Sequence, residues 1–294
     1  MNSLKEKFLQ LDKKKKTAII CGSVAAIILI VVIIVVISLN GKKEEPKPVA
    51  TATPKPTQTP VATIEPTPVP AAIPIDFNAW QAYNPDVYAW IYVPGTSVNY
   101  PILQSATDNS YYLDYNIDGT KGYPGCVYSE NINSKDFSDM HTVLYGHNMH
   151  AGYTYKGLDG TMFRTLHKFE DADFFNANRY FYIYTNNQVL TYEIFAAYTY
   201  DDRHLLNNYA LDQDGVFQEY INNIYLQKDG HIREDAVRVT AADKIVTMAT
   251  CTGNSATRWL VVGVLRSQEP GAYQELPDEC ATKAAVSVSS YQGQ

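Results

Sequence analysis

Residues 247–253 have the sequence TMATCTG, an apolar strand that ends in a cysteine and is followed at once by a polar loop containing glycine. A cysteine at the end of a strand can be exposed to a substrate while its backbone stays rigid, which is what a nucleophile requires. Arg258 opens the next predicted strand, seven residues after Cys251. We therefore expect the two strand ends to lie side by side across the loop, with Cys251 next to Arg258.

A second short apolar strand also ends in an ionisable side chain. Residues 143–148 have the sequence VLYGHN, so that Gly146 and His147 follow the apolar run directly. Histidine is the side chain whose ordinary pKa lets it exchange a proton near neutral pH. Glycine allows the close backbone approach that the lining of a cleft often requires. His147 is thus a candidate acid and base for Cys251.

The rest of the domain has the pattern of a mainly β protein. Asn186-Asn187 is a plausible hairpin turn between two of its predicted strands. Eight short strands in one domain favour a barrel or a sandwich. Runs rich in β-branched and aromatic residues predict strands at residues 89–93, 98–102, 125–129, 142–145, 180–185, 189–200, 244–249 and 258–265.

Four helical segments are predicted. Asp76 can cap a short helix that begins at Phe77, and residues 84–86 (Asn-Pro-Asp) precede what we expect to be a second helical turn. Residues 162–169 form another helical interruption. Residues 214–227 place their apolar side chains on one face at helical spacing, which predicts a helix packed against the core.

Charge is divided unevenly along the 294 residues. Residues 1–74 contain ten lysines and five acidic residues, which leaves 14 basic and 26 acidic residues for residues 75–294. A net charge of −12 on that part would repel a phosphate backbone, so we expect no nucleic-acid partner.

The amino-terminal part predicts a membrane anchor. Residues 17–39 carry no charge and are dense in Ile and Val, and at about 1.5 Å per residue they would span about 34 Å. Six lysines within residues 1–16 predict that this basic tail is cytoplasmic and that the rest of the chain is extracellular. A cleaved signal peptide is the alternative, but the apolar segment is long for one and no convincing cleavage site follows it.

Beyond the anchor, composition divides the chain into a stalk, a domain and a tail. Residues 46–74 contain nine of the fifteen prolines and six threonines, so residues 40–74 predict an extended spacer without a core. We expect the folded domain to comprise residues 75–267. The small, polar residues 268–294 predict a disordered tail.

The four cysteines leave at least one thiol outside the membrane unpaired. Cys21 lies in the predicted span, which leaves Cys126, Cys251 and Cys280 in an exported domain. A Cys126–Cys280 disulfide is permitted by this count alone, and Cys126 is otherwise expected to be a packed strand residue. The cysteine and histidine spacings match no zinc pattern, and we expect neither a metal site nor a cofactor.

Taken together, these segments resemble the sortase family. Residues 247–251 (TMATC) resemble the TLxTC motif of sortases with Met248 in place of Leu, residues 144–147 (LYGH) resemble the histidine strand, and residues 258–262 (RWLVV) resemble the arginine strand. The resemblance extends over about residues 77–266. Within it, the stretches that are more similar to class B than to class A sortases are WIYVPGT at 90–96, YPILQ at 100–104 and DNSYYL at 108–113.

This resemblance implies a closed eight-stranded sortase barrel with N-terminal helices and a helix in the connection between strands six and seven. It also implies a reaction in which Cys251 attacks the carbonyl of a substrate Thr to form a thioester. His147 would protonate the leaving amine and later deprotonate the incoming one, while Arg258 would hold the oxyanion. Arg266 is the alternative for that role, although it is expected at the opposite end of the barrel. Ala249, where class B members often have Ser, removes one hydrogen bond to the substrate.

The resemblance extends to the substrate groove. Asn109, Leu113 and Tyr145 match positions that line this groove in class B sortases, although Leu113 equally suits an ordinary core position. About forty residues connect strands six and seven, and a connection of that length is usually functional. We expect the loop at residues 201–211 and the helix after it to form one wall of the cleft. Its apolar surface would come from Leu205, Leu206 and Tyr209.

The remaining histidines and acidic clusters are weaker candidates for functional residues. His141 is expected to start a strand, and the side chains expected at the surface are His150, His167, His204 and His231. Residues 201–202 and 212–214 are acidic enough to suggest a calcium site, but a solvated loop that caps a helix is the preferred interpretation.

The implied partners are secreted proteins that carry a C-terminal sorting motif, together with an acceptor amine. The acceptor would be a peptidoglycan precursor of the lipid II type or, in a pilin-polymerising enzyme, a pilin lysine. A thiol endopeptidase shares the acyl-enzyme and remains an alternative. A stalked wall-binding module without activity is a further alternative, against which stands the placement of Cys251, His147 and Arg258 at strand ends.

Overall fold

The computed structural model describes residues 70–149, 154–155, 158–159, 162–207 and 213–275. The chain divides into two units, Met1–Glu65 and Pro66–Gln294, and all of the described residues belong to the second. The predicted tail (1–16), the anchor (17–39) and nearly all of the stalk lie outside the described residues. Among those that are described, no helix is long and apolar enough to cross a bilayer.

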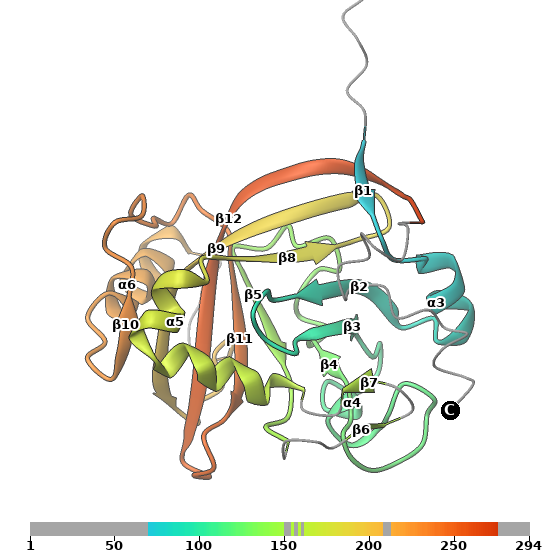
Figure 1. Cartoon of the computed structure of the whole chain (residues 1–294). Coiled ribbons are helices and arrows are strands. Elements are labelled where there is room, and N and C mark those ends of the chain that lie inside the picture. Colours follow the sequence, from blue (N-terminus) through green and yellow to red (C-terminus); the bar gives the residue numbers. More distant parts are fainter. Residues whose placement is uncertain (1–69, 150–153, 156–157, 160–161, 208–212, 276–294) are drawn as a thin grey trace, which may run out of the picture. The chain divides into compact units, whose positions relative to one another are not determined.

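Eight strands form a closed barrel, as predicted (Figure 1). Neighbouring strands follow the order β12-β11-β5-β4-β3-β2-β8-β9, and β9 pairs with β12 to close the ring. A sandwich is therefore excluded. The strands are β2 (Val87–Tyr92), β3 (Asn99–Leu103), β4 (Val127–Tyr128), β5 (His141–Tyr145), β8 (Tyr180–Tyr184), β9 (Gln188–Asp201), β11 (Ile245–Cys251) and β12 (Thr257–Tyr273).

The barrel is mixed, because β5 runs parallel to β11 and β3 runs parallel to β4, while the other neighbours in the ring are antiparallel. Each of the eight strands predicted from the sequence overlaps one of these strands. The hairpin predicted at Asn186-Asn187 joins β8 to β9. His141 begins β5, as expected.

Four further short strands have no counterpart in the sequence prediction. β1 (Ala71–Ile73) runs parallel to the end of β12, β10 (Gly230–Ile232) extends the sheet beyond β9, and β6 (Thr154–Tyr155) pairs with β7 (Leu158–Asp159). β1 precedes the predicted domain start at residue 75, and its Ile73 is buried. β12 likewise passes the predicted end of the domain at residue 267, because β9 and β1 continue to pair with it.

Three of the predicted helical segments are present, one is wrong, and two short helices, Tyr111–Asp114 and Ala172–Ala177, were not predicted. Asp76 caps α3 (Phe77–Tyr83) by accepting a bond from the backbone N–H of Ala79 at 3.0 Å. The helical turn predicted after residue 86 is wrong, since β2 begins at Val87 and continues the apolar run there as a strand. The other helical elements are α4 (Tyr111–Asp114), the 3-10 helix η1 (Phe163–Glu170), α5 (Ala172–Ala177) and α6 (Asp214–Ile224).

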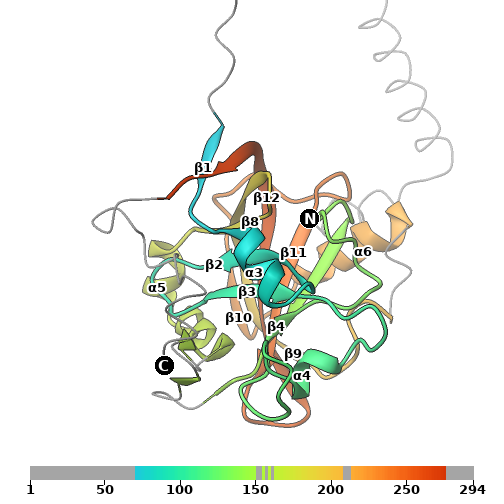
Figure 2. The ribbon, with the colours of Figure 1, turned by 90° about the vertical axis from the view of Figure 1, so that its right-hand side faces the viewer.

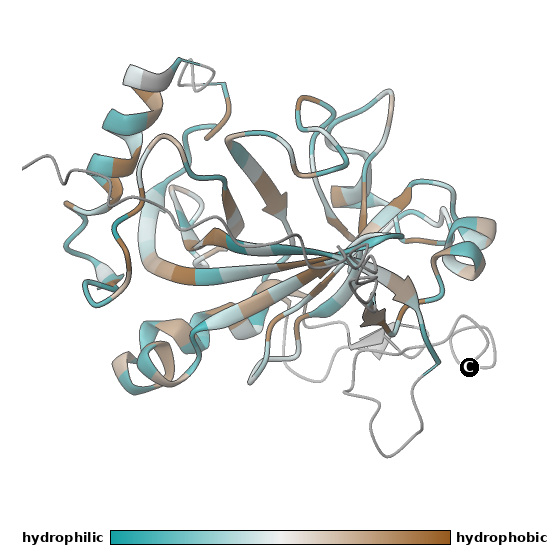
Figure 3. Ribbon diagram, turned by 90° about the horizontal axis from the view of Figure 1, so that it is seen from above, coloured by the Kyte–Doolittle hydropathy of each residue, from teal (hydrophilic) through white to brown (hydrophobic). Residues whose placement is uncertain are grey.

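α6 lies in the connection between β9 and β11, which are the sixth and seventh strands of the barrel (Figure 2). Both faces of β12 are buried: Trp259 and Val261 belong to the main core, whereas Leu260 and Val262 belong to a second cluster with α6. This explains why residues 259–265 of β12 (WLVVGVL) form an unbroken apolar run instead of alternating with polar residues; the hydropathy of each residue is mapped on the ribbon in Figure 3. The strand that carries Arg258 is therefore covered on both faces.

Candidate active site

The register of β11 and β12 places the predicted nucleophile beside the predicted arginine. The two strands are antiparallel, and Cys251 is the pairing partner of Arg258. The loop between them is tied across its base by a 2.5 Å hydrogen bond between the hydroxyls of Thr252 and Thr257. Cys251 is exposed although the strand before it is buried. The sequence prediction that these two strand ends lie side by side is confirmed.

His147 lies next to Cys251 on the opposite side of β11 from Arg258, because β5 pairs with one side of β11 and β12 with the other. In the parallel pair of β5 and β11, Tyr145 is the partner of Ala249, so the register carried forward two residues brings His147 to Cys251. The backbone N–H of Gly146 donates to the carbonyl of Ala249 at 3.2 Å and holds this approach. A Cβ at Gly146 would lie 2.8 Å from the buried Phe163 ring, which explains why glycine stands there.

The side chains of Cys251, Arg258 and His147 line one cavity of about 390 Å³. Of the six predicted site residues, five line it: Cys251, His147, Arg258, Leu113 and Tyr145. Asn109 is not among the lining residues, and its side-chain oxygen instead accepts a 2.8 Å bond from the backbone N–H of Asn131. Its predicted role in substrate binding stays a prediction. The other lining residues are Tyr128, Glu130, Gly146, Tyr200, Asp202, Arg203, His204, Leu205, Ala249 and Thr250.

The hydrogen bond of His147 fixes the roles of its two ring nitrogens. Nε2 lies 2.8 Å from the carbonyl oxygen of Leu113, and because a carbonyl can only accept, Nε2 must carry the proton. The edge of the ring meets the Tyr123 ring at a centroid distance of 5.1 Å. Nδ1 is therefore the nitrogen available for proton exchange with a thiol or with an amine.

The two arginines of β12 have different surroundings. Arg258 donates from Nη1 to the carbonyls of Ser255 and Thr257, at 3.0 and 2.9 Å, within the loop beside Cys251. Arg266 donates to the buried carboxylate of Glu193 at 2.7 Å and to the carbonyl of Val237 at 2.9 Å. Only Arg258 lines the cavity. The geometry thus agrees with Arg258, and not with Arg266, as the group near the oxyanion.

The cavity wall nearest β5 is aromatic and uncharged. Tyr128 and Tyr145 stack with ring centroids 5.4 Å apart. Burial raises the pKa of both phenols above the ordinary value, so both keep their protons at neutral pH. This wall offers an apolar, neutral surface to a peptide.

Two histidines that were expected at the surface lie at or next to the cavity. The imidazole of His204 lines the cavity and pairs with the carboxylate of Glu130 at 2.7 Å. Nε2 of His167 lies 3.0 Å from the carbonyl oxygen of Cys251. These partners are 74 and 84 residues distant in the chain, so no local pattern could have revealed them. His231 is half-buried and bonds the carbonyl of Glu170 at 2.8 Å, while His150 lies outside the described residues.

Leu205 lines the cavity, as predicted for the loop after β9, but no residue of α6 does. The helix instead buries Phe217 and Ile221 against the second cluster of the core. Its expected place in the cleft wall stays a prediction, because residues of α6 line a neighbouring hollow that shares Tyr200 and Arg203 with the cavity. Leu206 packs partly against the same cluster, and Tyr209 lies outside the described residues.

Cys126 has a different environment from Cys251. Its side chain is buried, its thiol faces the carbonyl of Tyr115 at 3.6 Å, and burial raises its pKa. A thiol of that kind is a poor nucleophile. Cys126 is therefore a packed residue, as expected, and its proposed partner Cys280 lies outside the described residues.

No group of metal-ligating side chains occurs among the described residues. In the acidic stretch considered for calcium, the carboxylate of Asp201 is held by the guanidinium of Arg203, at 2.8 Å, and Asp202 lines the cavity. Arg203 also lowers the pKa of Asp201.

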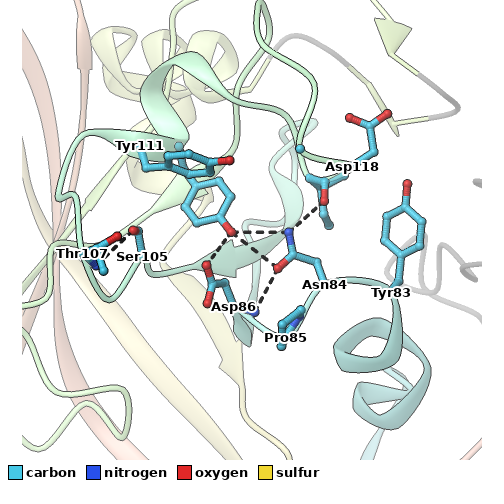
Figure 4. Close-up of a pocket in the computed structure, with 11 residues that line it drawn as sticks. Tyr83, Asn84, Pro85, Asp86, Ser105, Thr107, Tyr111 and Asp118 are labelled. Carbon is cyan, nitrogen blue, oxygen red and sulfur yellow. Dashed lines mark hydrogen bonds between the residues drawn. The ribbon is translucent and has the colours of Figure 1, made fainter.

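A second hollow, of about 480 Å³, is lined by residues that include Tyr83, Asp86 and Tyr111 (Figure 4). Tyr111 and Tyr112 of α4 line this hollow, whereas Leu113 lines the cavity of Cys251. Its polar groups bond to one another, with the Tyr112 hydroxyl donating to Asp86 at 2.7 Å. No cysteine or histidine lines this hollow, whereas Cys251 and His147 both line the cavity described above.

A closed mixed barrel with a cysteine, a histidine and an arginine on three adjacent strand ends defines a class of cysteine transpeptidases. Residues 91–266 match the family model described as the sortase domain, and the chain belongs to the sortase family. Within that family, the relatives that match are class B sortases. Sortase B of Listeria monocytogenes is 33% identical over 173 residues, which are 58% of this chain and 65% of that protein. The match thus spans a little less than two thirds of that relative's length.

Solved structures give the same result. The sortase B of Clostridium perfringens superposes with a TM-score of 0.56 at 27% identity, over 65% of this chain and 99% of that one. A Streptococcus pyogenes class B sortase involved in pilus biogenesis superposes with a TM-score of 0.54 at 28% identity, over 65% of this chain and 98% of that one. The predicted fold and family are confirmed.

Proposed function

We propose that this protein is a transpeptidase that cleaves the C-terminal sorting signal of secreted proteins after Thr and joins the new carboxyl end to a cell-wall amine. The observation that carries the proposal is the shared cavity of Cys251, His147 and Arg258, each fixed by the register of adjacent strands. Such a site suits acyl transfer, because a nucleophile, a proton carrier and a fixed cation meet where a carbonyl can bind.

In the first step, Nδ1 of His147 takes the thiol proton of Cys251, and the sulfur attacks the carbonyl carbon of the substrate Thr. Arg258 stabilises the negative charge that develops on the carbonyl oxygen. The peptide C–N bond then breaks, and Nδ1 of His147 gives its proton to the leaving amine, which leaves a thioester on Cys251. In the second step an acceptor amine attacks the thioester, Nδ1 of His147 takes up its proton, and the C–S bond breaks to give an amide and the thiolate of Cys251, to which His147 returns the proton.

Product analysis separates this reaction from that of a thiol endopeptidase. A fluorescent peptide library that ends in sorting-type motifs is incubated with the full-length protein, with and without oligoglycine or diaminopimelate. A new amide with the added amine is expected, and hydrolysis alone, at a rate that the amine does not change, would assign the endopeptidase activity. Cys251→Ala should abolish both products without changing the melting temperature. A binding module would give no product in any arm.

Pilin polymerisation is the second candidate, and the similarity to the pilus-associated sortase of Streptococcus pyogenes supports it. The two activities differ in the acceptor, a peptidoglycan-precursor amine in one case and a protein lysine in the other. Competition between a lipid II-type amine and a lysine-containing pilin peptide distinguishes them. Preferential transfer to the lysine peptide would favour pilus assembly.

For the location of the enzyme we propose a single-pass anchor at residues 17–39, with the basic residues 1–16 in the cytoplasm and the barrel outside. The uncharged segment and the lysines before it support this arrangement. Deleting residues 1–69 should release the protein from the membrane fraction. Digestion of intact spheroplasts from outside should cleave the barrel and spare a tag placed at residue 1.

A further inference from the structure

The backbone carbonyl of the nucleophile is held by two side chains that come from other elements. Nδ2 of Asn148 donates to the oxygen of Cys251 at 2.8 Å, and Nε2 of His167 lies 3.0 Å from the same oxygen. Asn148 follows His147 in the loop after β5, while His167 lies on η1. Neither side chain lines the cavity, so neither is placed to touch a substrate there.

Asn148 continues the ladder of β5 and β11 beyond the point where the backbone ladder stops. The last backbone bond of that series runs from the N–H of Gly146 to the carbonyl of Ala249. In a parallel ladder the next bond would join the N–H of Asn148 to the carbonyl of Cys251. The side-chain amide of Asn148 donates to that carbonyl. The carbonyl of Cys251, at the end of β11, is thereby bonded to the protein, whereas the carbonyl at a strand end usually bonds to water.

His167 has a proton on both ring nitrogens when it makes the bonds seen here. The carbonyl of Cys251 can only accept, so Nε2 must donate to it. Nδ1 lies 2.6 Å from the carboxylate of Glu170, which also only accepts. An imidazolium satisfies both contacts, and Glu170, three residues further along η1, balances its charge. In the neutral ring with its proton on Nδ1, Nε2 would instead accept from Asn148, which is 3.2 Å away.

The ring of His167 is also held by packing. It stacks on the indole of Trp259 with centroids 6.0 Å apart, and the indole N–H of Trp259 donates to the carbonyl of Leu166 at 3.0 Å. Trp259 follows Arg258 on β12. η1 is therefore docked on both catalytic strands at once, through the carbonyl of Cys251 on β11 and the indole of Trp259 on β12.

We propose that His167 and Asn148 are positioning residues, which fix the backbone of Cys251 so that its thiol stays beside His147. The proposal rests on the role of Cys251 as the nucleophile. Without the two donors, the last residue of β11 would sample more backbone conformations. The thiol would then spend less time next to the imidazole that exchanges its proton, and a displacement of that kind lowers turnover far more than it lowers affinity.

The test compares two variants of His167 in the full-length protein. His167→Phe keeps a flat ring on Trp259 but has no donor, whereas His167→Gln retains a donor of similar reach. We expect His167→Phe to lower kcat by about 10- to 100-fold with KM changed less than about threefold, and His167→Gln to recover most of the loss. Asn148→Ala should resemble His167→Phe. Lys168→Met is the matched control, since Lys168 also donates from η1 to a backbone carbonyl, that of Gly95 at 2.8 Å.

Alkylation of Cys251 by iodoacetamide, followed by mass spectrometry of the peptide that contains it, tests the proposal without any sorting peptide. The rate should fall in His167→Phe and Asn148→Ala, recover in His167→Gln and stay unchanged in Lys168→Met. Equal rates in the Phe and Gln variants, at equal melting temperatures, would overturn the positioning role. If no variant performs transpeptidation but the alkylation rates differ as expected, the proposed function fails and the positioning role stands. If His167→Phe unfolds, Asn148→Ala decides the test. A normal rate of Cys251 alkylation in Asn148→Ala would then overturn the proposal.

Discussion

The hydroxyl of Thr250 donates a hydrogen bond of 2.7 Å to the carbonyl oxygen of Gly146, and both groups are buried. Thr250 precedes Cys251 and Gly146 precedes His147, so this bond joins the two strands one residue before the side chains that we propose to be catalytic. Buried hydrogen bonds between rigid elements hold a site within the small tolerance that catalysis requires. The separation of Cys251 and His147 is therefore set by the barrel.

We predict that Gly146→Ala impairs both activity and folding. The new Cβ would lie 2.8 Å from the ring of Phe163, so η1 or the end of β5 must move, and overpacking of this kind costs about 1–3 kcal/mol. Turnover and urea denaturation measure the two effects. Adding Phe163→Leu should restore part of both, and a double variant no better than the single one would show that the ring is not the obstacle.

The two arginines of β12 should separate activity from stability. Arg258→Lys keeps the charge but loses the planar set of donors, and we expect kcat to fall by about 10²- to 10³-fold with little change in melting temperature. Arg266→Ala deprives the buried carboxylate of Glu193 of one partner, which should cost about 1–3 kcal/mol of stability and leave kcat within about twofold. The reverse pattern would assign the oxyanion role to Arg266.

Leu205 should influence which peptide is preferred. It is buried in the cavity wall, and in a hydrophobic pocket one missing group is worth about a 10- to 200-fold change in selectivity. Leu205→Ala should therefore change the ratio of kcat/KM between peptides with large and small apolar residues before the scissile Thr. The rate of Cys251 alkylation should stay near that of the unmodified protein. Leu226→Ala, at an exposed position outside the cavity, is the control and should alter neither.

His141 should make the folded state sensitive to mild acid. Its ring is buried with Nε2 2.8 Å from the hydroxyl of Thr247, and burial lowers its pKa from 6.5 to about 3. The unfolded chain therefore binds a proton between these two values while the folded chain does not. Stability is complete above about pH 6.5 and falls as the pH decreases towards 3, by at most about 1.4 kcal/mol per unit.

Urea denaturation of the unmodified protein and of His141→Gln, at several pH values from about 7 to about 4, measures this contribution. Gln can retain the bond to Thr247 and does not titrate. The difference in unfolding free energy between the two proteins should shrink as the pH falls. A constant difference would mean that His141 does not bind its proton differently in the two states.

The strands could be predicted from the sequence because they carry their own signal, whereas the choice of a barrel over a sandwich came from the resemblance to sortases. β11 and β12 are apolar runs bounded by a polar loop, and Cys251 and Arg258 stand at the ends of these runs, so local pattern was sufficient. β1 and β10 carry no such signal, since each has three residues and exists because β12 and β9 offer a partner. The contacts of His167 and His204 join distant segments, and only the folded chain brings them together.

The closure of the barrel also restricts how a peptide can be recognised. Many proteins bind an extended peptide by adding it as a strand to an open sheet edge, where backbone bonds give affinity whatever the sequence. β11 lies between β12 and β5, and the end of β12 that carries Arg258 lies between β11 and β9, so neither strand has such an edge to offer. A sorting peptide beside Cys251 must therefore be bound by side chains and loops. Because these contacts depend on the side chains of the peptide, binding itself requires discrimination between sequences.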